Sequence, residues 1–342
     1  MRLFPLTLLA CSLPLAALAV IPAPAQDVHV RVDPTVKTGI EGSTAFPTIQ
    51  NALDHHPLAG VRPDGTPGRV YIEIVPGIYH ERVIITQNHP DITLLGLGQS
   101  PSDTVISNSL NAKQAGGTFF TETAEINGDH FEADNLTFEN TAGETGQAVA
   151  AAVRADRAVF KHVRFLGHQD TLFADYGRQY YVDSYIEGGV DFIFGNAAAV
   201  FDRTEIHPVG PGYLTAQSRT SPAQATGYVI LNSHVTNGID PANPKNTFAL
   251  GRPWRPYSRV VYIHTDLPAN VAPTGWNNWG KTANETTAYY AESNDTGPGA
   301  DPSGRVAWSH QLTPAQAAAF LPANFLAGAD HWNPEADAAK LP

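Results

Sequence analysis

The chain has 342 residues and a formal net charge of −12, with 21 Lys and Arg against 33 Asp and Glu. This balance argues against a nucleic acid partner, because phosphate binding needs a basic face. The 29 Gly and 27 Pro residues predict frequent turns and many short elements rather than long helices.

Residues 1–25 have the features of a secretory signal peptide. Arg2 precedes an almost wholly apolar stretch, and small residues at Ala19 and Ala25 are suitable for cleavage. Prolines interrupt the apolar stretch, so a permanent membrane anchor is the weaker alternative. A lipoprotein acceptor at Cys11 would divide the stretch in half. We therefore expect export to the periplasm or the extracellular medium, without stable membrane association.

The expected mature chain, residues 26–342, contains no Cys, because the only one lies in the leader. A disulfide, a cysteine nucleophile and a Cys-based metal site are therefore excluded for it. No linker or low-complexity tract interrupts these residues, which indicates a single domain.

The first element of the mature chain is predicted to be an amphipathic helix over residues 43–56, with Phe46, Ile49 and Leu53 at helical spacing. The pattern then changes to short β-rich runs separated by Gly, Pro, Asn and Asp. These runs occupy residues 70–75, 83–85 and 92–95. No long helical segment separates them, which argues against a doubly wound α/β fold.

Five similar runs follow, at residues 135–138, 162–165, 184–187, 204–207 and 233–236. Their starts are 27, 22, 20 and 29 residues apart, which is typical of a solenoid whose coils pair as parallel strands. We predict an all-β fold, a right-handed parallel β-helix, and keep a β-sandwich as the alternative. The helix at 43–56 would cap one end. Near the other end, Thr313 as N-cap and Pro314 predict a second short helix extending to Phe320.

Polar residues separated by one repeat are expected to stack about 4.8 Å apart in such a solenoid. Gln147 and Gln169 are 22 residues apart, and Asp170 and Asp191 are 21 apart. A solvated polar ladder is the alternative interpretation. The aromatic and apolar residues on both sides of these four favour a functional cluster.

Two neighbouring aspartates do not both ionise easily, so one should keep its proton while a cation stabilises the other as an anion. Arg252 is the candidate cation. This division provides a nucleophile and a proton donor, and the two Gln amides are suitable donors to an oxyanion. Trp254 offers a flat face for a sugar ring. No Gly-x-Ser-x-Gly elbow is present, which argues against a serine esterase.

These motifs, in this order, resemble the pectin methylesterases, or pectinesterases. The matching segments are residues 46–50, 75–81, 96–98, 135–143, 147–150, 167–172, 191–195, 250–254 and 275–276. The resemblance implies a right-handed parallel β-helix that hydrolyses the C6 methyl esters of galacturonate units. The substrate would be pectin, a methyl-esterified homogalacturonan, and the reaction would need no metal and no cofactor. We expect a monomer.

The resemblance also implies a role for each residue of the cluster. Asp191 is similar to the nucleophile, and Asp170 to the acid that protonates methanol and then activates water. Gln169 resembles the main oxyanion donor, with Gln147 contributing to the same hole and to substrate contact. Arg252 resembles the partner that keeps Asp191 ionised and also binds sugar.

Further residues match positions that line the family's groove. Trp254 resembles a stacking platform and Thr118 a substrate-contacting residue. Phe173, Phe194 and Trp279 match groove aromatics, with core packing as the alternative for each. The chain departs from the family at Ala151 and Ala152, where Leu-Arg is usual, so a bulky core residue and a cation are missing.

Two other classes of function remain open from the sequence. A carboxylate pair on a solenoid also suits a glycoside hydrolase, and a lyase would use a basic residue beside Ca²⁺. The paired Gln donors favour acyl transfer, because glycosidic cleavage forms no oxyanion. A non-enzymatic β-solenoid, such as an adhesin or a polysaccharide-binding module, would lose nothing on replacement of Asp191 by Asn.

Overall fold

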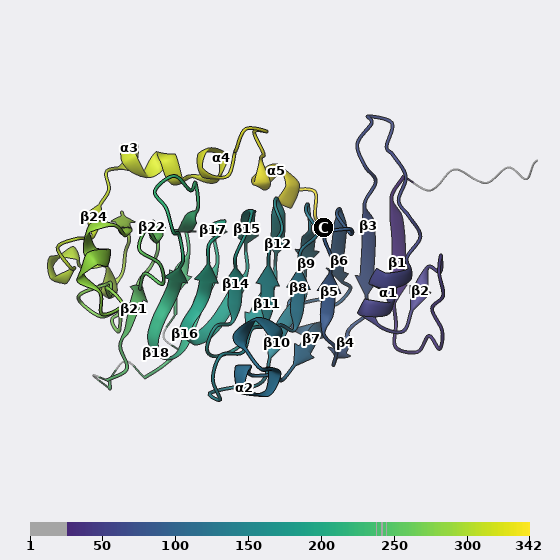
Figure 1. Ribbon diagram of the computed structural model, residues 1–342, viewed down its shortest axis with the longest axis horizontal. Coiled ribbons are helices and arrows are strands. Elements are labelled where there is room, and N and C mark those ends of the chain that lie inside the picture. The colour runs from purple at the N-terminus through teal and green to yellow at the C-terminus, as the bar shows by residue number, and fades with distance from the viewer. Residues whose placement is uncertain (1–25, 237, 241, 244) are drawn as a thin grey trace, which may run out of the picture.

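The computed structural model describes residues 26–236, 238–240, 242–243 and 245–342, so the predicted signal peptide lies outside the described residues. The chain forms an elongated solenoid whose coils stack along the long axis (Figure 1). Two twelve-stranded sheets run along it, and neighbouring strands in both are parallel. The predicted all-β parallel β-helix is therefore confirmed.

The first sheet contains, in spatial order, β2 (Ala45–Phe46), β1 (Val28–Val32), β3 (Val70–Ile74), β6 (Ile92–Gly96), β9 (Glu132–Asp134), β12 (Ala158–Lys161), β15 (Arg178–Val182), β17 (Ala198–Asp202), β19 (Gly227–Leu231), β22 (Arg259–Ile263), β23 (Tyr289–Ser293) and β24 (His310–Gln311). The second contains β4 (Gly77–Tyr79), β7 (Thr104–Asn108), β10 (Thr137–Asn140), β13 (Arg164–Leu166), β16 (Tyr185–Gly195), β14 (Leu172–Ala174), β11 (Ala151–Val153), β8 (Ala124–Ile126) and β5 (Val83–Ile85), and β18 (Glu205–Gln217), β20 (His234–Val235) and β21 (Phe248–Gly251) join it through β16.

The helices are short. They are α1 (Ile49–His55), α2 (Ala112–Ala115), α3 (Pro314–Ala317), α4 (Pro322–Phe325) and α5 (Pro334–Ala338), with 3-10 turns η1 (Pro101–Asp103), η2 (Thr118–Phe120), η3 (Thr282–Thr286), η4 (Pro298–Ala300), η5 (Pro302–Gly304) and η6 (Ala318–Phe320). Among the described residues, no helix has the length and apolar character needed to cross a membrane.

The repeat predicted from residue 135 onward corresponds to stacked strands of the second sheet. The register places Phe138 over Phe165, followed by Ile186, Ile206 and Val235. The second interval is therefore 21 residues, not the 22 counted between the starts of the runs. The run predicted to begin at residue 184 therefore begins one residue too late. The coils align on the inward-facing apolar side chain, not on the polar residue with which each run begins.

The helix predicted over residues 43–56 is shorter than expected. Ala45 and Phe46 pair with β1 as strand β2, and α1 begins only at Ile49. The Thr48 side chain accepts a hydrogen bond from the N–H of Asn51, which is the usual geometry of an N-cap. Phe46 is a buried residue of strand β2, so its helical spacing from Ile49 and Leu53 did not indicate a helix. α1 covers the N-terminal end of the solenoid (Figure 1).

The helix predicted after Thr313 is present as α3 near the last coil, and the chain then runs back along one side of the solenoid through α4 and α5 (Figure 1). This segment covers apolar side chains on the outer face of the first sheet. Arg178 fixes it there, because its guanidinium hydrogen-bonds to Asp156 and Asp330 and lies 5.5 Å from the Trp332 ring centroid. The sequence contained no signal for this return path.

Candidate active site

The four polar residues predicted to cluster lie on three neighbouring coils. Gln147 precedes β11, Gln169 and Asp170 precede β14, and Asp191 lies within β16. Gln147 is opposite Gln169 in a parallel bridge, and Gln169 is opposite Val190 in the next. The N–H of Asp170 donates to the Val190 carbonyl at 3.1 Å, so Asp170 and Asp191 occupy adjacent coils.

Both aspartates have a left-handed backbone, with φ of 65° at Asp170 and 52° at Asp191. This region is uncommon for residues other than Gly, although Asp tolerates it better than most. Such conformations cost about 1–3 kcal/mol each and tend to occur at functional sites. At Asp191 the strand pairing is also irregular, because the register between β16 and β18 shifts on both sides of Val190.

Arg252, which directly follows β21, binds the Asp191 carboxylate with two hydrogen bonds. Nε lies 2.8 Å from Oδ1 and Nη2 lies 2.6 Å from Oδ2. The guanidinium carbon is also 3.8 Å from the Tyr213 ring centroid and 3.9 Å from that of Trp279. Two aromatic faces therefore hold the cation in the orientation that suits a bidentate carboxylate contact.

The two carboxyls differ in their environment. Burial, together with the negative charge of Asp191, raises the pKa of Asp170 to about 8, with only partial opposition from Arg252. Burial also raises the pKa of Asp191, but the hydrogen bonds and charge of Arg252 oppose that rise. At neutral pH, Asp170 therefore holds a proton while Asp191 is the preferred anion.

A cleft of about 350 Å³ opens at this cluster. It is lined by Thr118, Phe119, Gln147, Gln169, Asp170, Asp191, Phe194, Ala216, Arg252, Trp254 and Trp279. All the candidate site residues except Phe173 thus share one cleft. Phe119 was missed, although it follows Thr118 directly and is 44% exposed. Tyr213 was also missed, because nothing in the sequence indicates that β18 would bring it to Arg252.

Phe173 lies beneath the cleft instead of lining it. Its side chain is buried and stacks on Phe194, with 4.6 Å between ring centroids. It also packs at a tilt against Phe119, with 4.9 Å between ring centroids. Phe173 thus packs against two aromatics that do line the cleft. Ala152 is its buried neighbour in β11, and the guanidinium of Arg154 lies 5.2 Å from the Phe173 centroid. A cation is therefore present near the position where the family's usual arginine is missing.

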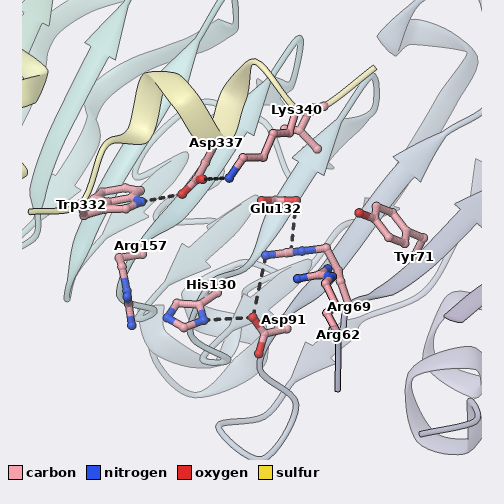
Figure 2. Close-up of a pocket in the computed structure, with 11 residues that line it drawn as sticks. Arg62, Arg69, Tyr71, Asp91, His130, Glu132, Arg157, Trp332, Asp337 and Lys340 are labelled. Atoms are coloured by element: carbon pink, nitrogen blue, oxygen red, sulfur yellow. Dashed lines mark hydrogen bonds and ion pairs between the residues drawn. The ribbon is translucent and has the colours of Figure 1, made fainter. Parts of the chain in front are cut away.

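A second hollow, of about 370 Å³, lies between the first sheet and the C-terminal segment (Figure 2). Each of its three carboxylates already pairs with a basic side chain of the same lining. Arg69 contacts Glu132 at 3.1 Å, His130 contacts Asp91 at 3.0 Å, and Lys340 contacts Asp337 at 2.7 Å. Because these contacts occupy all three lining carboxylates, and because none of the predicted site residues is there, the cleft at Asp191 is the candidate active site.

The Pectinesterase family model matches residues 35–329 of the chain. Pectinesterase 31 of Arabidopsis thaliana is 39% identical over 302 residues, which cover 85% of this chain and 92% of that protein. Pectinesterase 1 of Citrus sinensis is 38% identical over 308 residues, which cover 87% of this chain but only 51% of that protein. The chain thus spans about half the length of the Citrus relative.

Two solved structures are similar in fold as well. The pectin methylesterase from carrot has a TM-score of 0.79 and 34% identity, with 95% of this chain and 98% of that chain covered. The pectin methylesterase PemA from Erwinia chrysanthemi has a TM-score of 0.71 and 27% identity, with 91% and 99% covered. The resemblance drawn from the motifs is therefore confirmed, and the chain belongs to the pectinesterase family of carbohydrate esterases.

Proposed function

We propose that this protein hydrolyses the C6 methyl esters of galacturonate units in pectin, releasing methanol and pectate, with Asp191 as nucleophile and Asp170 as acid and base. One observation carries the assignment of roles: Arg252 stabilises the anion of Asp191, whereas the neighbouring Asp170 keeps its proton to a pKa of about 8. Both reactants are thus in the protonation state that acyl transfer needs.

In the first half-reaction, a carboxylate oxygen of Asp191 attacks the ester carbonyl carbon. The carbonyl electron pair moves to oxygen, and the amide N–H groups of Gln169 and Gln147 donate hydrogen bonds to this oxyanion. When the tetrahedral intermediate collapses, the bond to the methoxy group breaks, and Asp170 transfers its proton to the departing oxygen. The products are methanol and an anhydride between Asp191 and the galacturonate carboxyl group.

In the second half-reaction, the Asp170 carboxylate takes a proton from water as the water oxygen attacks the sugar's acyl carbon. The same two glutamines stabilise the second oxyanion. Collapse then breaks the bond to the Asp191 oxygen, which restores its carboxylate and releases a galacturonic acid unit. Asp170 is protonated again, so the cycle is balanced in atoms and protons and needs no cofactor.

The aromatic lining of the cleft supports a sugar polymer as substrate. Trp254 and Trp279 both line it, and each has a planar face of the kind that stacks on sugar rings. Phe119 is exposed beside Thr118 and adds a third aromatic surface. We assign substrate contact to Thr118, Gln147, Arg252, Trp254, Trp279 and, beyond the sequence prediction, Phe119.

The test is methanol release from highly methylated pectin by the wild type and by the Asp170→Asn and Asp191→Asn variants. We expect rapid release by the wild type and almost none by Asp191→Asn, with both variants folded by circular dichroism. New reducing ends in place of methanol would indicate a glycoside hydrolase, and an unsaturated uronide would indicate a lyase. Unchanged sugar binding without any product would indicate a binding protein.

We also propose that residues 1–25 direct export and are removed, and that residues 26–342 act as a single-domain monomer without membrane attachment. N-terminal sequencing of the protein recovered outside the cytoplasm checks the cleavage. Light scattering of that material should give the mass of one chain. Recovery in a membrane fraction with the leader intact would contradict the proposal.

A further inference from the structure

Gly189 lies two residues before Asp191, and the imidazole ring of His168 fills the space that a side chain at Gly189 would need. A Cβ at residue 189 would lie 2.7 Å from Cε1, 3.1 Å from Nε2 and 3.2 Å from Nδ1 of His168. All three nearest atoms thus belong to the same ring. The backbone of Gly189 is not in the left-handed region, so another residue could adopt it without strain.

Neighbouring glycines differ in this respect. A Cβ at Gly188 would clash with the Phe192 side chain, and one at Gly212 would lie 2.5 Å from the backbone oxygen of Gly189. Packing and the course of the chain therefore require those two glycines. Gly210 also contacts the His168 ring, but a Cβ there would lie 3.6 Å from Nε2, which is ordinary contact. Only at residue 189 does the imidazole itself exclude a side chain.

The contact between His168 and Gly189 joins the two coils that carry Asp170 and Asp191. His168 directly precedes Gln169 and Asp170, and its carbonyl accepts a hydrogen bond of 2.7 Å from the N–H of Gly189. The register irregularity of β16 lies between Gly188 and Val190, immediately before Asp191. The ring and the carbonyl of His168 therefore both contact the irregular segment from which Asp191 extends.

His168 also reaches the third coil of the site. Its Nε2 lies 3.3 Å from Oε1 of Glu144, in the connection between β10 and β11 that carries Gln147. The His168 side chain is mostly buried, whereas that of Glu144 is 81% exposed. The contact with Glu144 is thus the weaker of the two, because an exposed partner gains little from a charge pair.

We propose that His168 is a positioning residue. Its ring acts as a spacer between the coil that carries Asp170 and the segment that leads to Asp191, and it thereby sets the distance between them. This inference rests on the proposed function, because it concerns how the same two carboxyls are kept adjacent. His168 itself contacts no reacting atom in the mechanism. A misplacement of about 1 Å at reacting groups can lower turnover about a hundredfold, so such a spacer has a measurable effect.

The test combines Gly189→Ala, His168→Ala and the double variant, assayed by methanol release. Gly189→Ala pushes against the ring and should lower kcat between about tenfold and a hundredfold, with a smaller change in KM. His168→Ala removes the spacer and should also lower kcat. In the double variant the methyl group added at residue 189 occupies part of the vacated space, so its kcat should exceed that of Gly189→Ala. Gly210→Ala, which contacts the same ring without a clash, is the matched control and should match the wild type.

The pH profile separates positioning from mere structural damage. If the two carboxyls move apart in His168→Ala, Asp191 raises the pKa of Asp170 less, and the alkaline limb of kcat shifts to lower pH. His168→Phe keeps a ring over Gly189 and loses the Glu144 contact, so it should restore most of the turnover and the profile. Should Gly189→Ala fail to fold, these two His168 variants carry the test.

Several outcomes would overturn the inference while leaving the proposed function intact. One is an active wild type with Gly189→Ala as active as Gly210→Ala. Another is a double variant no better than Gly189→Ala. A third is a His168→Ala variant whose loss of activity merely follows its melting temperature, with an unchanged pH profile. A wild type that releases no methanol from pectin would instead contradict the proposed function, and this inference with it.

Discussion

Two aspartates in different parts of the solenoid, Asp170 in the cleft and Asp295 after β23, have carboxyl pKa values raised to about 8 by burial. In both places a second carboxylate adds to the rise and an arginine opposes it. Asp170 has Asp191 and Arg252 as these neighbours. Asp295 has the corresponding pair in Glu292 and Arg305.

The difference between the two regions is access. The Glu292 and Arg305 side chains are only 3% and 4% exposed, and Glu292 also accepts a hydrogen bond from Trp276 Nε1. Asp295 accepts a backbone hydrogen bond from Thr265, while its Oδ2 is buried without a partner among the described residues. By contrast, Asp191 and Arg252 line a cleft that also presents two glutamine side chains.

A proton-holding carboxyl beside an ion pair is therefore not sufficient to identify an active site. This arrangement occurs at both Asp170 and Asp295, and of these two places the one at Asp170 combines it with an open cleft and donors suitable for an oxyanion. The site at Asp295 is a natural control for the site at Asp170, since both combine a buried carboxyl with a second carboxylate and an arginine.

The largest effect should come from removing the proposed nucleophile. We expect Asp191→Asn to lower kcat by at least about 10⁴-fold, because no carboxylate remains to attack the ester. Asp295→Asn changes the matching carboxyl of the other region and should leave kcat unchanged. Methanol release measures both. Comparable losses in the two variants would show that the difference in access does not decide function.

The next effect concerns the proton on Asp170. Since this carboxyl must be protonated to release methanol, kcat should fall about tenfold per pH unit above about pH 8. A pH profile of methanol release with the wild type tests this, and Asp295→Asn should show the same alkaline limb. An alkaline limb that disappears in Asp295→Asn would mean that the assignment has been made to the wrong region.

A smaller effect should follow from loosening Arg252. Trp279→Leu removes one aromatic face and should lower kcat/KM roughly 2- to 30-fold. It should also shift the acidic limb of the pH profile upward, because a looser Arg252 stabilises the Asp191 anion less. Trp254→Leu is the comparison, since that ring lies over Arg255 at 4.7 Å and should weaken substrate binding without moving the limb.

The smallest effect on activity, but a clear one on stability, belongs to Asp295. In the unfolded chain this carboxyl ionises near its ordinary pKa, whereas in the folded chain it keeps its proton to about 8. Stability of the wild type should therefore decline by up to about 1.4 kcal/mol per pH unit between these values from this group alone, and no further above pH 8. Urea unfolding at pH 5 and pH 8 should show a smaller decline for Asp295→Asn. An equal decline in the free energy of unfolding for the wild type and Asp295→Asn would show that Asp295 does not hold this proton.

Much of the fold could be predicted from the spacing of short runs. Stacking of Gln147 on Gln169 and of Asp170 beside Asp191 depends only on a coil length of about 21 or 22 residues, which the repeats contain. The boundaries of α1 and of the run at 184 were less predictable. Phe46 lies at helical spacing but belongs to strand β2, and Ser184 opens its run one residue late. In both cases only the pairing with another coil shows where the element begins.

Aromatic residues were the hardest to place. Phe173 and Phe119 both follow a predicted site motif, but one packs beneath the cleft and the other is exposed in it. An aromatic side chain stabilises a protein in either position, so its presence in the sequence does not say which face it occupies. The position of Tyr213 against Arg252 likewise depends on how β18 and β21 pair.

The amino-acid sequence by itself determined the family, the coiled architecture and the candidate residues for the chemistry, because each is encoded by local motifs and their intervals. The tertiary structure decided which carboxyl pair opens to solvent, which aromatics face the cleft and how the C-terminal segment covers the first sheet. These outcomes depend on contacts between segments far apart in the chain, and burial and charge act through such contacts rather than through sequence order.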